Sequence, residues 1–170
     1  KFKENFYQRL AFDEIFSTFL VNSEIRKKIK KIKKTKKKFD IKKQNEIISS
    51  LDFSLTNDQT KTLNEINNDL CSDNKMFRLL QGDVGSGKTI VSLLSAFNTI
   101  SSDFQVAVMA PTEILARQHF LLAKKIFPEH IKIELLSGKS TYKNKKIILG
   151  KLLKKEIDII FGTHALFQKK

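Results

Sequence analysis

The chain has 170 residues, 41% of them hydrophobic, and a formal net charge of +14, which allows one sizeable domain with its own core. Its fourteen Phe residues argue against a disordered chain, because solvated segments carry few aromatics. The single cysteine, Cys71, excludes an internal disulfide and a cysteine metal cluster, and it fits a reducing compartment. No run of 18 apolar residues is present, so we expect no membrane span, and the charged N-terminus does not have the pattern of a signal peptide.

The positive charge is concentrated near the N-terminus. Between Glu24 and Lys43, twelve Lys or Arg residues stand against two acidic ones, which leaves about +4 for the rest of the chain. Apolar residues recur at helical spacing through the first forty residues, at Phe12, Ile15, Phe16, Phe19, Leu20, Ile25, Ile29 and Ile32. This periodicity predicts a helix that continues through the Lys-rich run 27–38. Because like charges repel, that run needs a packed surface or nearby phosphates to stay helical.

Residues 39–56 have a mixed pattern and end in a loop over 49–56, and a regular alternation follows. Helices are expected at 57–70, 88–100, 113–127 and 141–155, and strands at 76–80, 105–110, 131–135 and 157–161. Pro128 stops the third of these helices. Because nearly all-apolar strands alternate with helices, the sequence predicts an α/β fold with a parallel sheet covered by helices on both faces.

Residues 82–89 match the phosphate-binding pattern G-x-x-x-x-G-K-[ST] between an apolar strand and an apolar helix. Glycines let the backbone bend tightly and turn N–H groups toward phosphate oxygens, and the following helix adds the positive end of its dipole. Lys88 is expected to reach the β- and γ-phosphates, and the Thr89 hydroxyl to hold Mg²⁺, so these two are also the catalytic candidates. The predicted phosphate-binding residues are Gly82, Asp83, Val84, Gly85, Ser86, Gly87, Lys88 and Thr89.

A phosphate site does not by itself define a reaction. Hydrolysis also needs a carboxylate pair on another strand, and no Asp-Glu pair ends an apolar strand after this loop. The chain also lacks a starting Met, and its last residues follow directly on an apolar stretch. We therefore expect it to be a piece of a larger protein, with nucleotide binding that is weak and Mg²⁺-assisted and with negligible hydrolysis by itself.

Five segments in order resemble the RecG-type ATP-dependent DNA helicases of superfamily 2, namely 53–59, 79–89, 108–119, 135–140 and 159–167, and residues 9–16 resemble the segment before the motor in that family. The resemblance implies a RecA-like P-loop domain in an ATP-dependent helicase or translocase. Such enzymes act on branched DNA and stalled replication forks in recombination and repair. The resemblance places an N-terminal linker helix and basic segment at 1–50. The first RecA-like ATP-binding domain, C-terminally incomplete, falls at 51–170.

The resemblance also implies residue roles. Phe53 is expected to stack on adenine and Gln59 to pair with its edge, since an amide both donates and accepts. Loops that follow parallel strands share one sheet edge, so the expected contacts to the DNA backbone gather there. They are Thr112, Arg117, Ser137, Gly138, Thr163 and His164. Plain helix capping is an equal alternative for Thr112, and for His164 a supporting hydrogen bond is favoured over direct contact.

Cofactors implied by the resemblance are ATP and Mg²⁺, and the partner is branched or forked DNA, bound through its backbone. The same resemblance implies a monomer in the bacterial cytoplasm, away from membranes. One position departs from the family pattern, because Lys155 stands where a Gly usually closes the helix before the last strand. A left-handed cap costs a non-glycine residue about 1 kcal/mol, so we expect that helix end to be remodelled.

Two other functions remain open at this point. A transcription–repair coupling translocase carries similar motifs, although residues 9–16 and 162–166 favour the RecG type. The other is a non-catalytic remnant whose Lys-rich helix binds nucleic acid by charge alone. Binding by charge weakens steeply with salt and ignores ATP, whereas a motor domain shows Lys88-dependent ATP binding. Whether the run 27–38 contacts DNA or is a solvated face also stays open.

Overall fold

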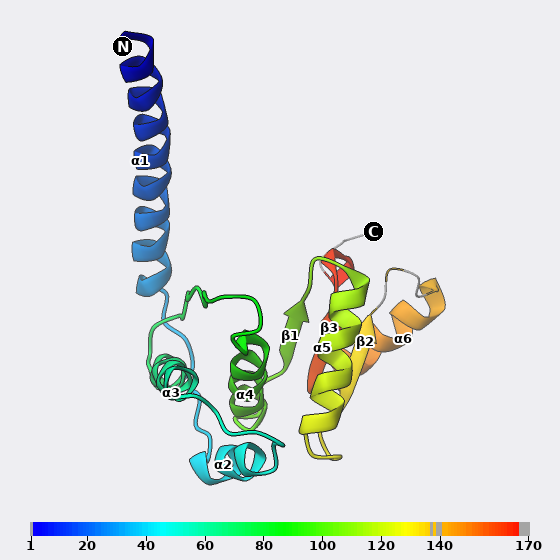
Figure 1. Cartoon of the computed structure of the whole chain (residues 1–170). Coiled ribbons are helices and arrows are strands. Elements are labelled where there is room, and N and C mark those ends of the chain that lie inside the picture. The colour runs from blue at the N-terminus through cyan, green and yellow to red at the C-terminus, as the bar shows by residue number, and fades with distance from the viewer. Residues whose placement is uncertain (1, 137, 139–140, 167–170) are drawn as a thin grey trace.

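The computed structural model describes residues 2–136, 138 and 141–166. The elements are α1 (Phe2–Lys31), α2 (Ile41–Ser49), α3 (Asn57–Cys71), α4 (Lys88–Ile100), β1 (Val106–Met109), α5 (Glu113–Ile126), β2 (Ile133–Leu136), α6 (Tyr142–Leu153), β3 (Ile159–Gly162) and the 3₁₀ turn η1 (His164–Leu166). In Figure 1, α1 projects as a separate arm from a body that the other elements form. No helix in the described part of the chain combines the length and the apolar character needed to cross a bilayer.

The sheet has three parallel strands in the order β1-β3-β2. All four residues of the central strand β3 are buried. Ile159 and Phe161 join the larger apolar cluster, to which α4 and α5 contribute, whereas Ile160 packs with Ile148 and Leu152 of α6 on the other side. Because successive side chains of a strand point to opposite faces, α4 and α5 cover one face and α6 covers the other. The predicted fold class is confirmed.

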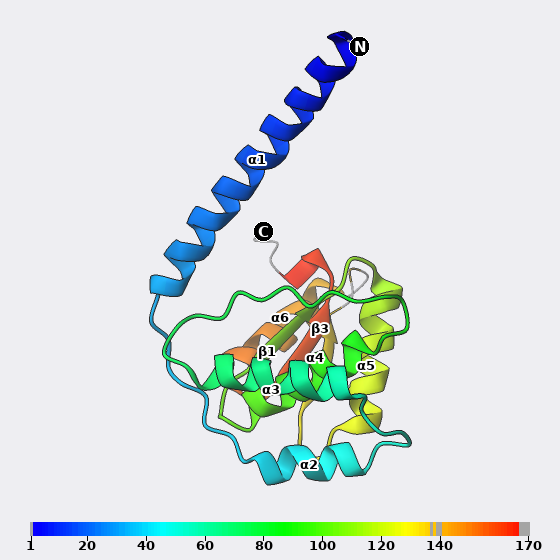
Figure 2. The ribbon, with the colours of Figure 1, turned by 60° about the vertical axis from the view of Figure 1, so that its left-hand side comes forward.

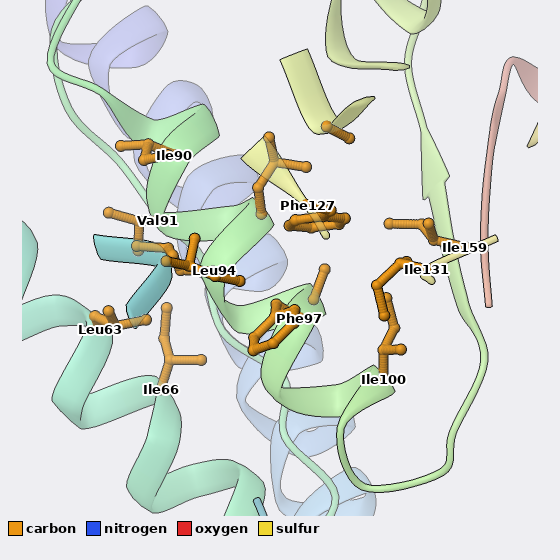
Figure 3. Packing of buried hydrophobic residues seen from close by; sticks show 14 of the residues in the cluster. Leu63, Ile66, Ile90, Val91, Leu94, Phe97, Ile100, Phe127, Ile131 and Ile159 are labelled. Carbon is orange, nitrogen blue, oxygen red and sulfur yellow. The ribbon is translucent and has the colours of Figure 1, made fainter. Parts of the chain in front are cut away.

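The larger cluster lies between α3, α4, α5 and the sheet. Leu63 and Leu94 are almost fully buried where α3 meets α4, and Figure 3 shows these apolar side chains turned toward each other. The Phe97 and Phe127 rings, from α4 and the end of α5, lie 5.9 Å apart. The apolar spacing that predicts these helices is therefore the spacing of their buried faces.

Helix α2 falls inside the stretch for which the sequence predicts no single element. The Asp40 side chain accepts a hydrogen bond from Lys42 N–H and caps the helix start. Gln44 is one of three buried amides, each from a different helix. Asn67 Nδ2 donates to Gln44 Oε1 at 2.8 Å, and Asn98 Nδ2 donates to Asn67 Oδ1 at 2.7 Å. A third bond runs from Asn98 to Gln44. The burial of this amide triangle depends on α3 and α4, so the local sequence could not reveal it.

The prediction that 27–38 is helical is wrong beyond Lys31. Residues 32–38, here called the strap, run extended past the C-terminal end of α3. The Lys34 ammonium donates to the carbonyl oxygens of Asp69 and Leu70, at 2.8 and 3.1 Å, and the Lys37 ammonium lies over the Phe104 ring. Burial lowers the pKa of Lys34, and the charge of Asp69 partly offsets this effect. The pKa of Lys37 is lowered by burial and by the positive charge of Lys34. A continuous helix would lose these contacts and would stack like charges.

The predicted strand at 76–80 is also absent, although the segment is extended. A strand needs a neighbour for its backbone N–H and C=O groups, and among the described residues none pairs with 76–80. Phe77 and Leu79 are accordingly 64% and 76% exposed. The remaining helices and strands lie within two residues of the predicted ranges.

The expected remodelling after α6 does not occur. Lys155 adopts a left-handed conformation, with φ at 57°. Glu156 N–H donates to Lys151 O at 2.9 Å, and Lys155 N–H donates to Leu152 O at 3.1 Å. This pair of bonds is a Schellman cap, with lysine in the position that favours glycine.

Candidate functional site

The loop 82–87 connects the extended residues 75–81, here called the lead segment, to α4. Gly85 and Gly87 have φ of 83° and 80°, a left-handed backbone that suits glycine. Gly87 is the N-cap of α4, and no side chain of the described residues caps this helix start. The first N–H groups of α4 therefore remain available to an anion, at the positive end of the helix dipole.

Lys88 turns its side chain back into the loop. Its ammonium donates to Gly82 O at 2.8 Å and to Asp83 O at 2.6 Å, and it lies 3.4 Å from Ser86 Oγ. Thr89, the next residue, is half-buried in the first turn of α4. An ammonium, free N–H groups and a hydroxyl at one helix start fit a phosphate group with its Mg²⁺. Val84 stands fully exposed at the tip, so its contribution is limited to backbone.

Gln59 lies directly against this loop. Thr56 and Gln59 form a capping box at the start of α3, and Gln59 Nε2 donates to Ser86 O at 2.9 Å. A Cβ on Gly87 would collide with the Gln59 amide, so glycine is needed for this close approach. Gln59 and the loop line one pocket of about 360 Å³. Thr56 was missed as a site residue, although the Thr-x-x-Gln pattern is visible in the sequence.

Phe53 is not brought to the same place. It is 53% exposed and lines a different cavity, with Ile48 of α2 and Leu63 of α3. The structure therefore joins Gln59 to the phosphate loop but leaves Phe53 outside the pocket that contains Lys88. A stacking role for Phe53 stays a prediction.

The predicted DNA contacts follow the carboxyl ends of the strands. Met109 and Leu136 pair with Gly162, so all three strands end at one level. Thr163 and His164 come directly after β3, and Gly138 lies exposed shortly after β2, whereas Ser137 lies outside the described residues. The loops after these strands therefore share one sheet edge, and contact of their residues with DNA stays a prediction.

Thr112 and Arg117 differ in how they are used. The Thr112 hydroxyl caps α5 by accepting from Leu115 N–H at 3.3 Å, which fits the capping alternative. Arg117 is exposed on α5.

Gly162, the last residue of β3, has a packing role, because a Cβ there would lie 2.9 Å from Leu136 O and 2.8 Å from Leu166 Cγ.

Comparison with known proteins bears on these motifs directly. A sequence model of DEAD/DEAH box helicases matches residues 56–170. The chain belongs to the DEAD/DEAH box helicase family. It is similar to two proteins named ATP-dependent DNA helicase RecG. The protein from Thermotoga maritima is 43% identical over 95% of this chain, and the protein from Aquifex aeolicus is 40% identical over 99%. A solved structure described as RecG bound to a three-way DNA junction shares 43% identity and a TM-score of 0.84 over 96% of this chain.

This member of the DEAD/DEAH box helicase family spans about a fifth of the relatives' length, 21% and 22% for the two named above. The structural match likewise covers 22% of the solved chain. The predicted resemblance to RecG-type helicases and the RecA-like fold are both confirmed. The loop 82–89 and Gln59 form one group of residues, and the sheet edge that carries Thr112 and His164 forms another.

Proposed function

We propose that this chain is the nucleotide-binding part of an ATP-dependent DNA helicase or translocase that acts on branched DNA and stalled replication forks. The observation that carries the proposal is the phosphate loop, in which Lys88 and the free start of α4 converge on the space beside Gln59. The names of the relatives and the DNA junction in the related structure support it. In this reading, residues 1–50 form a linker helix with its basic segment, and 51–170 belong to the first motor domain.

Each group at the loop has a distinct task. The N–H groups of the loop and the Lys88 ammonium bind phosphate oxygens, and the Thr89 hydroxyl holds Mg²⁺. Gln59 positions the loop through Ser86 O and pairs with the base, on which Phe53 stacks. ATP, when bound with Mg²⁺, supplies the phosphoanhydride whose hydrolysis drives movement along DNA. The chain's own residues bind and orient it.

The second group of residues is assigned to DNA. Thr112, Arg117, Ser137, Gly138, Thr163 and His164 contact the sugar–phosphate backbone, because backbone contacts position a strand without reading its sequence. A motor that moves along DNA needs contacts of this kind. We further propose that the protein works as a monomer in the bacterial cytoplasm.

Titration with a fluorescent ATP analogue and Mg²⁺ tests the nucleotide site. Lys88→Ala removes a charged donor and is expected to weaken binding about 10-fold or more. Lys61→Ala is the matched control, because Lys61 is an exposed lysine of α3 outside the loop. Equal binding by Lys88→Ala and the unaltered chain would refute the assignment of the loop. Thr89→Val is expected to reduce the dependence of binding on Mg²⁺.

A further inference from the structure

Helix α3 is bonded at both of its ends to segments that come from different parts of the chain. At its N-terminal end, Gln59 donates to Ser86 O of the phosphate loop. At its C-terminal end, the strap arrives from α1, and Lys34 donates to the last carbonyl groups of the helix. Gln59 and Asp69 are ten positions apart along the helix, a span of about 15 Å. The phosphate loop and the strap that follows α1 therefore contact one and the same helix.

Asp69 is where the two connections meet. Its carbonyl oxygen accepts from Lys34, and its carboxylate accepts from Arg78 Nε and Nη2, at 2.9 and 2.8 Å. Arg78 Nη1 also donates to Glu65 at 2.8 Å, one helical turn earlier. These bonds raise the pKa of Arg78, whose planar head suits two carboxylates at once. Arg78 belongs to the lead segment, four residues before Gly82, so α3 binds the segment that enters the phosphate loop as well as the loop itself.

The bonds at the strap are specific and not a general charge effect. Lys34 N–H donates to Asp73 O, and Lys37 N–H donates to Leu70 O, so the strap backbone is also fastened to the end of α3. Lys75 N–H, at the start of the lead segment, donates to Ile32 O of the strap. Lysines are favoured at helix C-termini because the last carbonyls carry partial negative charge. Part of the basic run thus serves to attach α1.

Helix α3 is suited to transmit movement because its packed face and its capped start make it a rigid unit. Leu63, Ile66 and Leu70 are buried along one side of it, and the capping box closes its N-terminus. Figure 2 shows the strap passing one end of α3 while residues 72–87 run back above the helix toward α4. A ligand that turns the Ser86 carbonyl must shift or break its bond to Gln59.

We propose that α3 couples the phosphate loop to the arm α1, with Lys34 and Arg78 as positioning residues that fasten the strap and the lead segment to the same end of the helix. Nucleotide at the loop then changes the orientation of α1, and the attachment of α1 in turn changes nucleotide affinity, since coupling between two sites is reciprocal. The inference rests on the proposed function, because it requires nucleotide at the loop.

Spin-label distances between Ser23→Cys on α1 and Gln118→Cys on α5 report the orientation of the arm. Both positions are exposed, and the exposed Cys71 is replaced by serine so that it takes no label. The distance is expected to change when an ATP analogue with Mg²⁺ binds to the labelled protein. Lys34→Met removes the ammonium and keeps an unbranched stem of similar length. It is expected to abolish that change and to weaken binding of the analogue about 5-fold or more.

Two further variants separate positioning from stability. Lys36→Met is the matched control, because Lys36 lies in the same strap but pairs with the exposed carboxylate of Asp73 at 3.4 Å. It is expected to keep both the distance change and the affinity within 2-fold, roughly the effect of a surface charge. Arg78→Met should match Lys34→Met, and Arg78→Lys should recover part of the response. Thermal unfolding checks that each variant is folded.

The outcomes distinguish this inference from the proposed function. Loss of the arm response in Lys34→Met and Arg78→Met, with Lys36→Met unchanged, supports the coupling. Nucleotide binding without any change in the distance overturns the inference alone, and so does an identical response of Lys34→Met and Lys36→Met. No binding by the unaltered chain overturns the proposed function, and the inference with it.

Discussion

Replacing Lys155 by glycine is expected to stabilise the protein. Lys155 has a φ of 57°, and its cap is already well formed by the bonds from Glu156 N–H to Lys151 O and from Lys155 N–H to Leu152 O. Glycine keeps these bonds and removes a left-handed strain of about 1–2 kcal/mol. The freer unfolded chain offsets about 0.4–1 kcal/mol of this gain. A net gain of about 1 kcal/mol would raise Tm by about 2–4 °C in a chain of this size.

Urea unfolding followed by circular dichroism measures the change, and the neighbouring lysine provides the control. Lys154 has φ −83° and ψ 1°, so Lys154→Gly relieves no left-handed strain and is expected to cost about 0.5–1 kcal/mol. Asp103→Gly should gain less than Lys155→Gly, because aspartate tolerates its φ of 63° better than lysine does. If Lys155→Gly lowers the free energy of unfolding as Lys154→Gly does, the reasoning from backbone strain is wrong.

Other positions offer independent tests by equilibrium unfolding and NMR. Gly162→Ala should destabilise the protein by about 1–3 kcal/mol, because the new methyl group meets a backbone carbonyl of β2. Gly150→Ala, in open space within α6, should stabilise it by about 0.5–1 kcal/mol. Equal effects of the two variants would contradict the close packing at Gly162. Asn98→Asp should cost about 3 kcal/mol, since it places a carboxylate opposite the two acceptors of the buried amide triangle, and a neutral result would mean that the triangle is not formed. The hydrogen bond from Lys125 lowers the pKa of Asp52, so the stabilisation from this pair is present above the ordinary carboxyl pKa and is lost as the pH falls through the lowered value. A carboxyl NMR titration should show that lowered pKa, and Lys125→Met should return it to the ordinary range; an unchanged pKa in that variant would refute the pairing.

Local signals in the sequence were sufficient for several parts of this structure. The left-handed glycines at 85 and 87 and the apolar spacing of α4 are visible in the local sequence, so the pattern 82–89 predicts both the loop and the helix that follows it. The place of Gln59 beside the loop was predictable through the family resemblance. The position of Phe53 was not, because it depends on how the loop before α3 packs on α2.

Periodicity failed where a distant partner decides the conformation. The Lys-rich run has a helical apolar spacing, yet it is extended after Lys31 because the carbonyl oxygens of Asp69 and Leu70, more than thirty residues away, accept the Lys34 ammonium. Residues 76–80 have the composition of a strand, but a strand is defined by backbone bonds to a neighbour, and none of the described residues supplies them.

The sequence by itself determined most of the helices, the strands of the parallel sheet and the phosphate loop, because turn geometry and helix periodicity act over a few residues. Only the tertiary structure decided that α3 carries the phosphate loop at one end and the strap of α1 at the other. The bond of Asp69 to Lys34, like the amide triangle, joins segments that are far apart in the chain. Their energy depends on packing that no local pattern encodes.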